Sequence, residues 1–189
     1  MQVKVAGKLV RLRPFQDLDE LATLTRTLNT EDQYWGPSWW PLSRMRQGFE
    51  QHGMLDTSCW FSFAAIDRLD TRELIGYEVI QLPKPGQLRA EIGTGILKQH
   101  WHNGFGREAK LLAMALLFDN YPVECLTATT LNHHRRAIAG MEAIGMRREG
   151  SIRRSVFTNG MYADKVKYII TRQEWQRLQL NNESHGPEA

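Results

Sequence analysis

Hydrophobic and polar residues alternate along several short stretches of the chain, and this period of two predicts β-strands. Turn-forming residues separate the stretches, and Asn159-Gly160 between the last two is a strong signal for a tight hairpin. The expected strands span residues 3–12, 59–66, 73–82, 88–97, 124–130, 147–157 and 161–171.

Four other segments have apolar residues at helical spacing. Asp17 or Asp19 should cap the first helix, which runs to Asn29, and Asn132 should cap the last, which Gly145 should end. The other two helices are expected from Ser43 to about Gly53 and from near Arg107 to Tyr121-Pro122. The order is then strand, two helices, three strands, helix, strand, helix and two strands, a mixed α/β fold. We expect one domain over residues 1–180 and a flexible tail over 181–189.

Composition fits this picture. A chain of 189 residues with 42% hydrophobic residues can form one domain with a real core. No uncharged apolar run of about 18 residues predicts a membrane span, and charges spread through the first residues argue against a signal peptide. Cys59 and Cys125 lie in apolar strands and are interpreted as reduced core residues of a cytoplasmic protein. The formal charge of +3 suits a polyphosphate ligand without proving one.

The stretch from Ala90 to Leu117 carries the first chemical signal. A strand is followed by Gly104 and Gly106 and then by an apolar helix. The first N–H groups of a helix have no partner inside it, and glycine lets the backbone come close to a phosphate. The stretch therefore predicts a phosphate-bearing ligand held by backbone, with a simple tight turn as the alternative. It is neither the dinucleotide fingerprint nor a Walker A loop.

The glycine loop and three segments that follow it together resemble a known family. Trp101 to Gly106 (WHNGFG) resembles the Gln/Arg-x-x-Gly-x-Gly/Ala coenzyme A loop of the GNAT superfamily, with Trp101 in the Gln/Arg position. Asn132, MEAIGMRREG at 141–150 and FTNGMYADKVKYIITRQEW at 157–175 follow in the family's order. The resemblance spans about residues 5–178. It is strongest to the ribosomal-protein N-terminal acetyltransferases and related antibiotic-modifying enzymes.

The resemblance implies the GNAT acyl-CoA N-acyltransferase fold, a mostly antiparallel twisted sheet flanked by helices, and acetyl-CoA as acyl donor without a metal. Backbone groups of Gly95, Ile96 and Leu97 would pair with the pantetheine arm, and the N–H groups of residues 102–107 would meet the pyrophosphate. The cofactor-binding candidates after the strand are Trp101, His102, Asn103, Gly104, Phe105, Gly106, Arg107, Asn132 and Arg135.

Four aromatic residues gather in the loop that joins the first two expected helices: Tyr34, Trp35, Trp39 and Trp40. Aromatic walls offer rigid area and cation–π contact to an amine, so these four are the acceptor-binding candidates. The alternative is a lid that covers the edge of the core.

Acyl transfer to an amine calls for a base near the acceptor. Glu91 is the first candidate, with a structural hydrogen bond as its alternative role. Glu78 is the second, with an outward-facing strand position as the alternative; water could also take the proton. The general acid stays unassigned, since Met141 and Arg135 stand where the family or this branch often has Tyr or Ser, and Tyr162 is a speculative substitute.

The basic run His133 to Arg136 has three interpretations: a solvated face, a contact to the coenzyme A 3′-phosphate, or a nucleic-acid surface extended by Arg147, Arg148, Arg153 and Arg154. His100 and His102 lack companions at metal-ligand spacing.

The main hypothesis is an acetyl-CoA-dependent N-acetyltransferase that acts on a primary amine of a small metabolite, an antibiotic or a peptide N-terminus. The alternatives are an aminoacyl-tRNA-dependent acyltransferase of the same fold and a noncatalytic acyl-CoA-binding module. Nucleic acid is a possible but not favoured partner, and the chain is expected to be a monomer or a homodimer.

Overall fold

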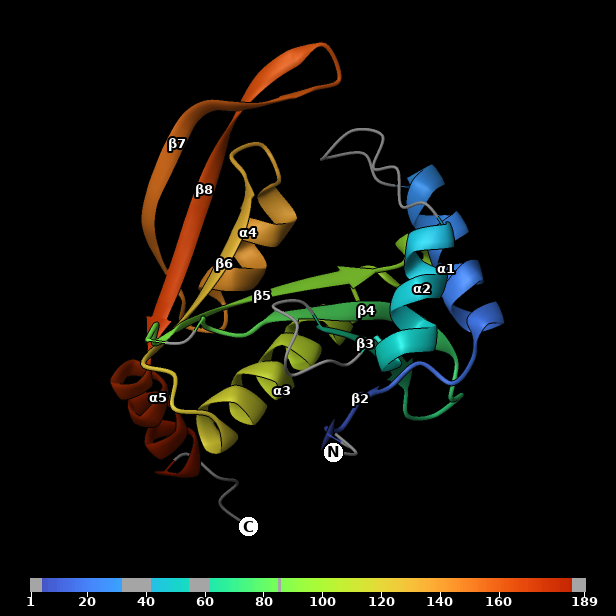
Figure 1. The fold of residues 1–189 in the computed structure, drawn as a ribbon. Coiled ribbons are helices and arrows are strands. Elements are labelled where there is room, and N and C mark those ends of the chain that lie inside the picture. Colours follow the sequence, from blue (N-terminus) through green and yellow to red (C-terminus); the bar gives the residue numbers. More distant parts are fainter. Residues whose placement is uncertain (1–4, 32–41, 55–61, 85, 185–189) are drawn as a thin grey trace.

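The computed structural model describes residues 5–31, 42–54, 62–84 and 86–184. Its elements are β1 (Val5–Ala6), β2 (Val10–Arg13), α1 (Leu18–Glu31), α2 (Leu42–His52), β3 (Ser62–Arg68), β4 (Leu74–Gln81), β5 (Arg89–Ile96), the 3-10 turn η1 (Lys98–His100), α3 (Phe105–Asn120), β6 (Cys125–Leu131), α4 (Arg135–Glu142), β7 (Arg147–Thr158), β8 (Met161–Thr171) and α5 (Arg172–Ser184) (Figure 1).

The eight described strands form one sheet in the order β1-β2-β3-β4-β5-β6-β8-β7. Every neighbouring pair in it is antiparallel except β5 and β6. The predicted mixed α/β fold with a mostly antiparallel sheet is therefore confirmed.

Helices cover both faces of the sheet. Helix α3 packs against β2, β4 and β5, and its buried residues Ala109, Met114 and Leu117 join the larger core. Helices α1 and α2 pack on the other face of the sheet, against side chains such as Ala65 and Tyr77, which belong to a second core. The central strands thus lie between α3 on one side and the α1–α2 pair on the other (Figure 1).

The N-terminal strand is shorter than predicted. The described part of residues 3–12 forms two strands, β1 and β2, joined by a turn and paired with Val5 opposite Leu12. The Glu108 carboxylate of α3 accepts hydrogen bonds from the N–H groups of Lys8, Leu9 and Val10, at 2.7–2.9 Å. In a continuous strand these N–H groups would bond to a neighbouring strand. Here the Glu108 carboxylate accepts their hydrogen bonds instead.

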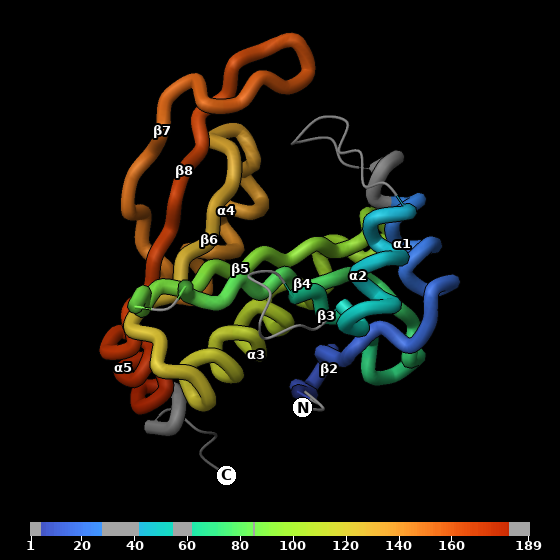
Figure 2. Tube along the Cα trace, in the orientation of Figure 1, coloured from blue at the N-terminus to red at the C-terminus, as the bar shows by residue number. Residues whose placement is uncertain are grey.

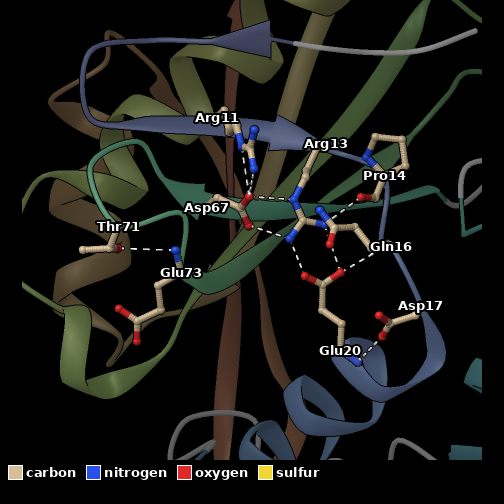
Figure 3. Close-up of polar contacts among 9 residues, drawn as sticks. All are labelled: Arg11, Arg13, Pro14, Gln16, Asp17, Glu20, Asp67, Thr71 and Glu73. Carbon is tan, nitrogen blue, oxygen red and sulfur yellow. Dashed lines mark hydrogen bonds and ion pairs between the residues drawn. The ribbon is translucent and has the colours of Figure 1, made fainter.

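A buried ion-pair network ties α1 to the sheet (Figure 3). Asp67 of β3 is fully buried and accepts hydrogen bonds from Arg11 and Arg13 of β2, at 2.6–2.9 Å. Arg13 also donates to Glu20 of α1. Two carboxylates and two guanidinium groups therefore satisfy one another under α1.

The predicted helix ends are partly confirmed. Asp17 accepts the N–H of Glu20 and caps α1 as expected. Gly145, at φ +85°, ends α4: its N–H bonds to Glu142 O and that of Met146 to Met141 O, the Schellman pattern. The prediction of Asn132 as a cap is wrong. The N-cap of α4 is His134, and Asn132 Oδ1 accepts the N–H of Asp164 instead.

The C-terminal part combines a confirmed hairpin with a helix that was not predicted. Asn159 and Gly160 both have positive φ, as a type I′ turn between β7 and β8 requires. Helix α5 then begins at a capping box, in which Thr171 and Glu174 bond reciprocally to each other's backbone N–H. The helix includes residues 181–184, which were assigned to the tail. Thr-x-x-Glu was the local signal that would have revealed it.

Candidate active site

The site is a cleft that opens where β5 and β6 separate. These parallel strands pair only from Arg89–Cys125 to Glu91–Thr127 and then diverge, as the trace in Figure 2 shows. A cavity of about 460 Å³ occupies the gap. The start of α3 forms one wall of the cavity and residues of β6 and α4 form the other. The split in the sheet thus gives a ligand access to both strand edges.

One end of this cavity is the N-terminus of α3. All six residues from His102 to Arg107 line it, and no described side chain caps the helix. Gly104 has φ +79°, which a residue with a side chain adopts only under strain. A Cβ on Gly106 would lie 3.3 Å from Ile96 Cγ1, so this glycine lets α3 approach β5 closely. The glycines therefore make the tight turn, and that turn leaves the positive end of a 16-residue helix open to the cavity.

Trp101 and Arg136 meet across the cleft. The Trp101 indole Nε1 donates to the Ile96 carbonyl at 2.6 Å, and the Arg136 guanidinium carbon of α4 lies 3.3 Å from the centre of the Trp101 ring. Both side chains line the cavity. This cation–π stack joins the two walls near the α3 turn.

The backbone expected to hold pantetheine is partly engaged. The Ile96 carbonyl takes the Trp101 bond, and the Leu97 N–H donates to Ile75 O at 2.9 Å. Ile96 lines the cavity, whereas Gly95 and Leu97 do not. A Cβ on Gly95 would lie 2.2 Å from the Tyr77 ring, so glycine is needed there for packing.

Glu78 lies beneath the cleft on the α3 side of the sheet. Its register partner on β5 is Thr94, whose hydroxyl accepts a 2.7 Å hydrogen bond from Lys110 Nζ of α3. Glu78 is 0% exposed, so its interpretation as an outward-facing residue is wrong. Neither of its carboxylate oxygens has a hydrogen-bond partner within the described ranges.

The surroundings of Glu78 change its acidity. Burial raises the pKa of Glu78 to about 7, although the Lys110 charge and the Thr94 hydroxyl oppose the rise. Burial likewise lowers the pKa of Lys110, and the Glu78 charge opposes that change. Thr94 and Lys110 line the cavity, whereas Glu78 does not. Glu78 therefore does not contact the cavity, although its two polar neighbours do.

Glu91 lies at the point where β5 and β6 part, on the strand parity opposite to Thr94. It is half-buried, and its side chain forms no hydrogen bond or ion pair with the residues that the structure describes. It lines the first cavity and also a second of about 640 Å³ between β5, β6 and the β7–β8 hairpin. This carboxylate therefore faces the side of the sheet away from α3, where a second reactant can approach.

Comparison with known proteins decides the family. Residues 10–147 match the acetyltransferase (GNAT) domain model. The chain belongs to the GNAT acetyltransferase family.

Named relatives agree with this assignment. The uncharacterized N-acetyltransferase YoaA of Bacillus subtilis (strain 168) is 29% identical over 107 residues, 57% of this chain and 60% of YoaA. The chain therefore spans about three-fifths of that relative. A spermidine N-acetyltransferase SpeG chimera from Vibrio cholerae and hSSAT has a TM-score of 0.77 at 18% identity, over 89% of this chain and 99% of that one. A GCN5-related N-acetyltransferase from Brucella melitensis has a TM-score of 0.76 at 18% identity, over 97% and 85%. These two structures share the fold.

The remaining predicted residues of this GNAT protein lie apart from the cavities or outside the described residues. Asn132 and Arg135 line neither cavity. Tyr162 is 59% exposed in the hairpin and packs on Phe157 and Arg154, which gives it no contact with the cleft. The four aromatic acceptor candidates, Tyr34, Trp35, Trp39 and Trp40, and also Cys59, fall outside the described ranges.

Three lysines that line the cavities were missed by the sequence interpretation: Lys110, Lys165 and Lys167. Lys110 could have been found, because it follows Gly106 by four positions and so shares its helix face. Nothing local marked the two β8 lysines.

Three further observations concern metal ligands, disulfide bonds and membrane spans in the described residues. Among the described residues, no cluster of three or more His, Cys, Asp or Glu could hold a metal ion. Cys125 of β6 is not in a disulfide bond. None of the described helices is both long and apolar enough to cross a bilayer.

Proposed function

We propose that this protein is an acetyl-CoA-dependent N-acetyltransferase whose donor and acceptor meet in the split between β5 and β6. The observation that carries the proposal is a cavity with the N-terminus of α3 at one end and the Glu91 carboxylate at the other, neither of which a described side chain caps or pairs. An open helix N-terminus suits a pyrophosphate, and a free carboxylate suits an amine. Membership of the GNAT family supports this pairing of ligands.

Different residues of the cleft would contact the phosphates and the arm of the donor. The N–H groups of His102 to Arg107 would hold the donor phosphates, as the resemblance implies. Trp101 and Arg136 would have to separate, or be moved aside, where the donor's arm lies along β5. When bound, acetyl-CoA supplies a thioester carbonyl for attack and a thiol as leaving group.

Glu91 is our proposed general base. It would accept the proton of the acceptor ammonium, directly or through one water, so that the neutral amine attacks without a covalent enzyme intermediate. Burial raises the pKa of Glu78, but this residue lies on the opposite face and does not line the cavity, so we assign it second place. The acceptor would be a primary amine of a small metabolite, an antibiotic or a peptide N-terminus, the last as in the ribosomal-protein branch.

The test compares Glu91→Gln with Glu124→Gln, which changes an exposed carboxylate just before β6 and serves as control. Thiol release from acetyl-CoA would be followed with a panel of amines, and donor binding by calorimetry. We expect Glu91→Gln to lower kcat by about 10²–10⁴-fold with donor affinity unchanged, and the control to match the native protein.

Two results would contradict the proposal in different ways. Native-like turnover of Glu91→Gln would show that water or another group removes the proton. Failure of acetyl-CoA to bind, or binding with no thiol release for any amine, would argue against the enzyme and in favour of the noncatalytic module. Steeply salt-dependent RNA binding without donor binding would favour the tRNA-dependent alternative.

A further inference from the structure

The second cavity has a wall of positive charge that the proposed chemistry does not use. Lys165 and Lys167 lie two positions apart on β8, so their side chains point to the same face of the sheet. Lys167 stands opposite Thr129 of β6, and both residues line this cavity. Thr129 in turn lies two positions beyond Thr127, the register partner of Glu91. Glu91 and the two lysines therefore share one face and one cavity.

The two lysines of this cavity are not paired with carboxylates within the described parts of the chain. Glu149 forms an ion pair with Arg89, at 2.7 Å. The ammonium groups of Lys165 and Lys167 have no carboxylate partner among the described residues, although both side chains are half-buried. Two like charges on neighbouring positions of a partly enclosed wall repel each other, and a bound anion would relieve that repulsion.

The hydroxyl of Ser151 and the side chain of Thr129 line the same cavity, so neutral hydrogen-bond groups accompany the charges. Glu91 supplies negative charge at the end next to the cleft, and the lysines supply positive charge on the β8 side. A ligand that complements this arrangement carries an amine at one end and an anion at the other.

We propose that the acceptor is a small amine that also carries a carboxylate, such as an amino acid or a short acidic peptide. This inference rests on the proposed function and specifies its acceptor class. The carboxylate would bind Lys165 and Lys167 while the amine lies at Glu91. A polyamine would instead place a second ammonium group against two lysines, which is unfavourable. The lysines make and break no bond, so they are specificity residues.

The experiment uses acceptors that differ only in charge: an amino acid, its methyl ester and its amide, together with spermidine. The variant is Lys165→Met with Lys167→Met, which keeps the length of the side chains. Its control is Lys8→Met with Lys84→Met, two exposed residues outside both cavities that give the same change in net charge.

For the native protein we expect kcat/KM to be at least about tenfold higher for the acid than for its ester or amide, and lowest for spermidine. In the double variant the KM for the acid should rise about tenfold or more, with kcat nearly unchanged and the ester unaffected. The control should behave as the native protein does.

A preference for spermidine or for the ester would overturn the inference, as would an equal loss for acid and ester in the double variant. Absence of thiol release with every amine would count against the proposed function and not by itself against the anion site. Calorimetric titration of the amino acid decides that case: binding that the double variant loses supports the site, and no binding to the native protein overturns it.

Discussion

Asp67 of β3 and Glu78 of β4 are both completely buried in the same sheet, but their surroundings differ. Arg11 and Arg13 donate hydrogen bonds to both oxygens of Asp67 (Figure 3). Within the described residues neither oxygen of Glu78 accepts a hydrogen bond. Asp67 lies under α1, whereas Glu78 lies beneath the cleft between β5 and β6.

The difference separates a structural carboxylate from one that can change charge during function. A buried charge is tolerated when it is paired and hydrogen-bonded, and then it holds elements together. A buried carboxyl group without such partners favours its neutral form, which is why the pKa of Glu78 is about 7. Groups with such pKa values are enriched at functional sites.

Removing the charge of Asp67 should have the largest effect on stability. Asp67→Asn keeps the shape of the side chain but removes one of the two carboxylates that pair with Arg13, which is 8% exposed. We expect the free energy of unfolding in urea to fall by about 3–5 kcal/mol. Asp70→Asn breaks the exposed Arg68–Asp70 pair and should produce no measurable change. Equal effects of the two substitutions would show that burial of Asp67 does not matter.

Glu78→Gln should remove a pH dependence. The folded-state pKa of Glu78, about 7, lies above the ordinary glutamate value of 4.5, so between these values the folded state binds more protons than the unfolded state. The stabilisation is then complete below about pH 4.5 and is lost as pH rises through 7. Across this window the free energy of unfolding of the native protein should therefore fall by about 3 kcal/mol relative to that of Glu78→Gln.

Urea unfolding at several pH values from 4.5 to 8 would measure this difference, with Glu124→Gln as the exposed control. Parallel stability curves for the native protein and Glu78→Gln would mean that Glu78 does not titrate in this range. The contrast with Asp67 would then fail.

Glu108 offers a third, smaller test, because its carboxylate is bonded to backbone and not to charges. Glu108→Gln leaves one oxygen to serve the N–H groups of Lys8, Leu9 and Val10. We expect a loss of about 1–3 kcal/mol and faster hydrogen exchange at Leu9 and Val10. Asp119→Asn, on an exposed residue of the same helix, is the control. Unchanged exchange at these amides would show that the turn does not depend on the carboxylate.

The sequence alone determined the features that depend on neighbouring residues. Strand alternation, the Asn159-Gly160 turn, the Asp17 cap and Gly145 as a helix end are local, and the structure has all of them. The order of the motifs also indicated the GNAT family. Local reasoning failed where side chains compete for the backbone, as at Asn132, and it passed over the Thr171–Glu174 capping box.

Only the tertiary structure decided which face each side chain occupies and what it meets there. Alternation within each strand does not relate Glu78 of β4 to Glu91 of β5. The register between the two strands places them on opposite faces, one covered by α3 and the other open to the second cavity. The contact of Glu108 with Lys8 spans 100 residues, and Glu91 shares a cavity with the β8 lysines only because β5, β6 and β8 lie side by side. Charge and burial at the site arise from these long-range contacts, because the environment of an ionisable group is set by what packs around it and not by its neighbours in the chain.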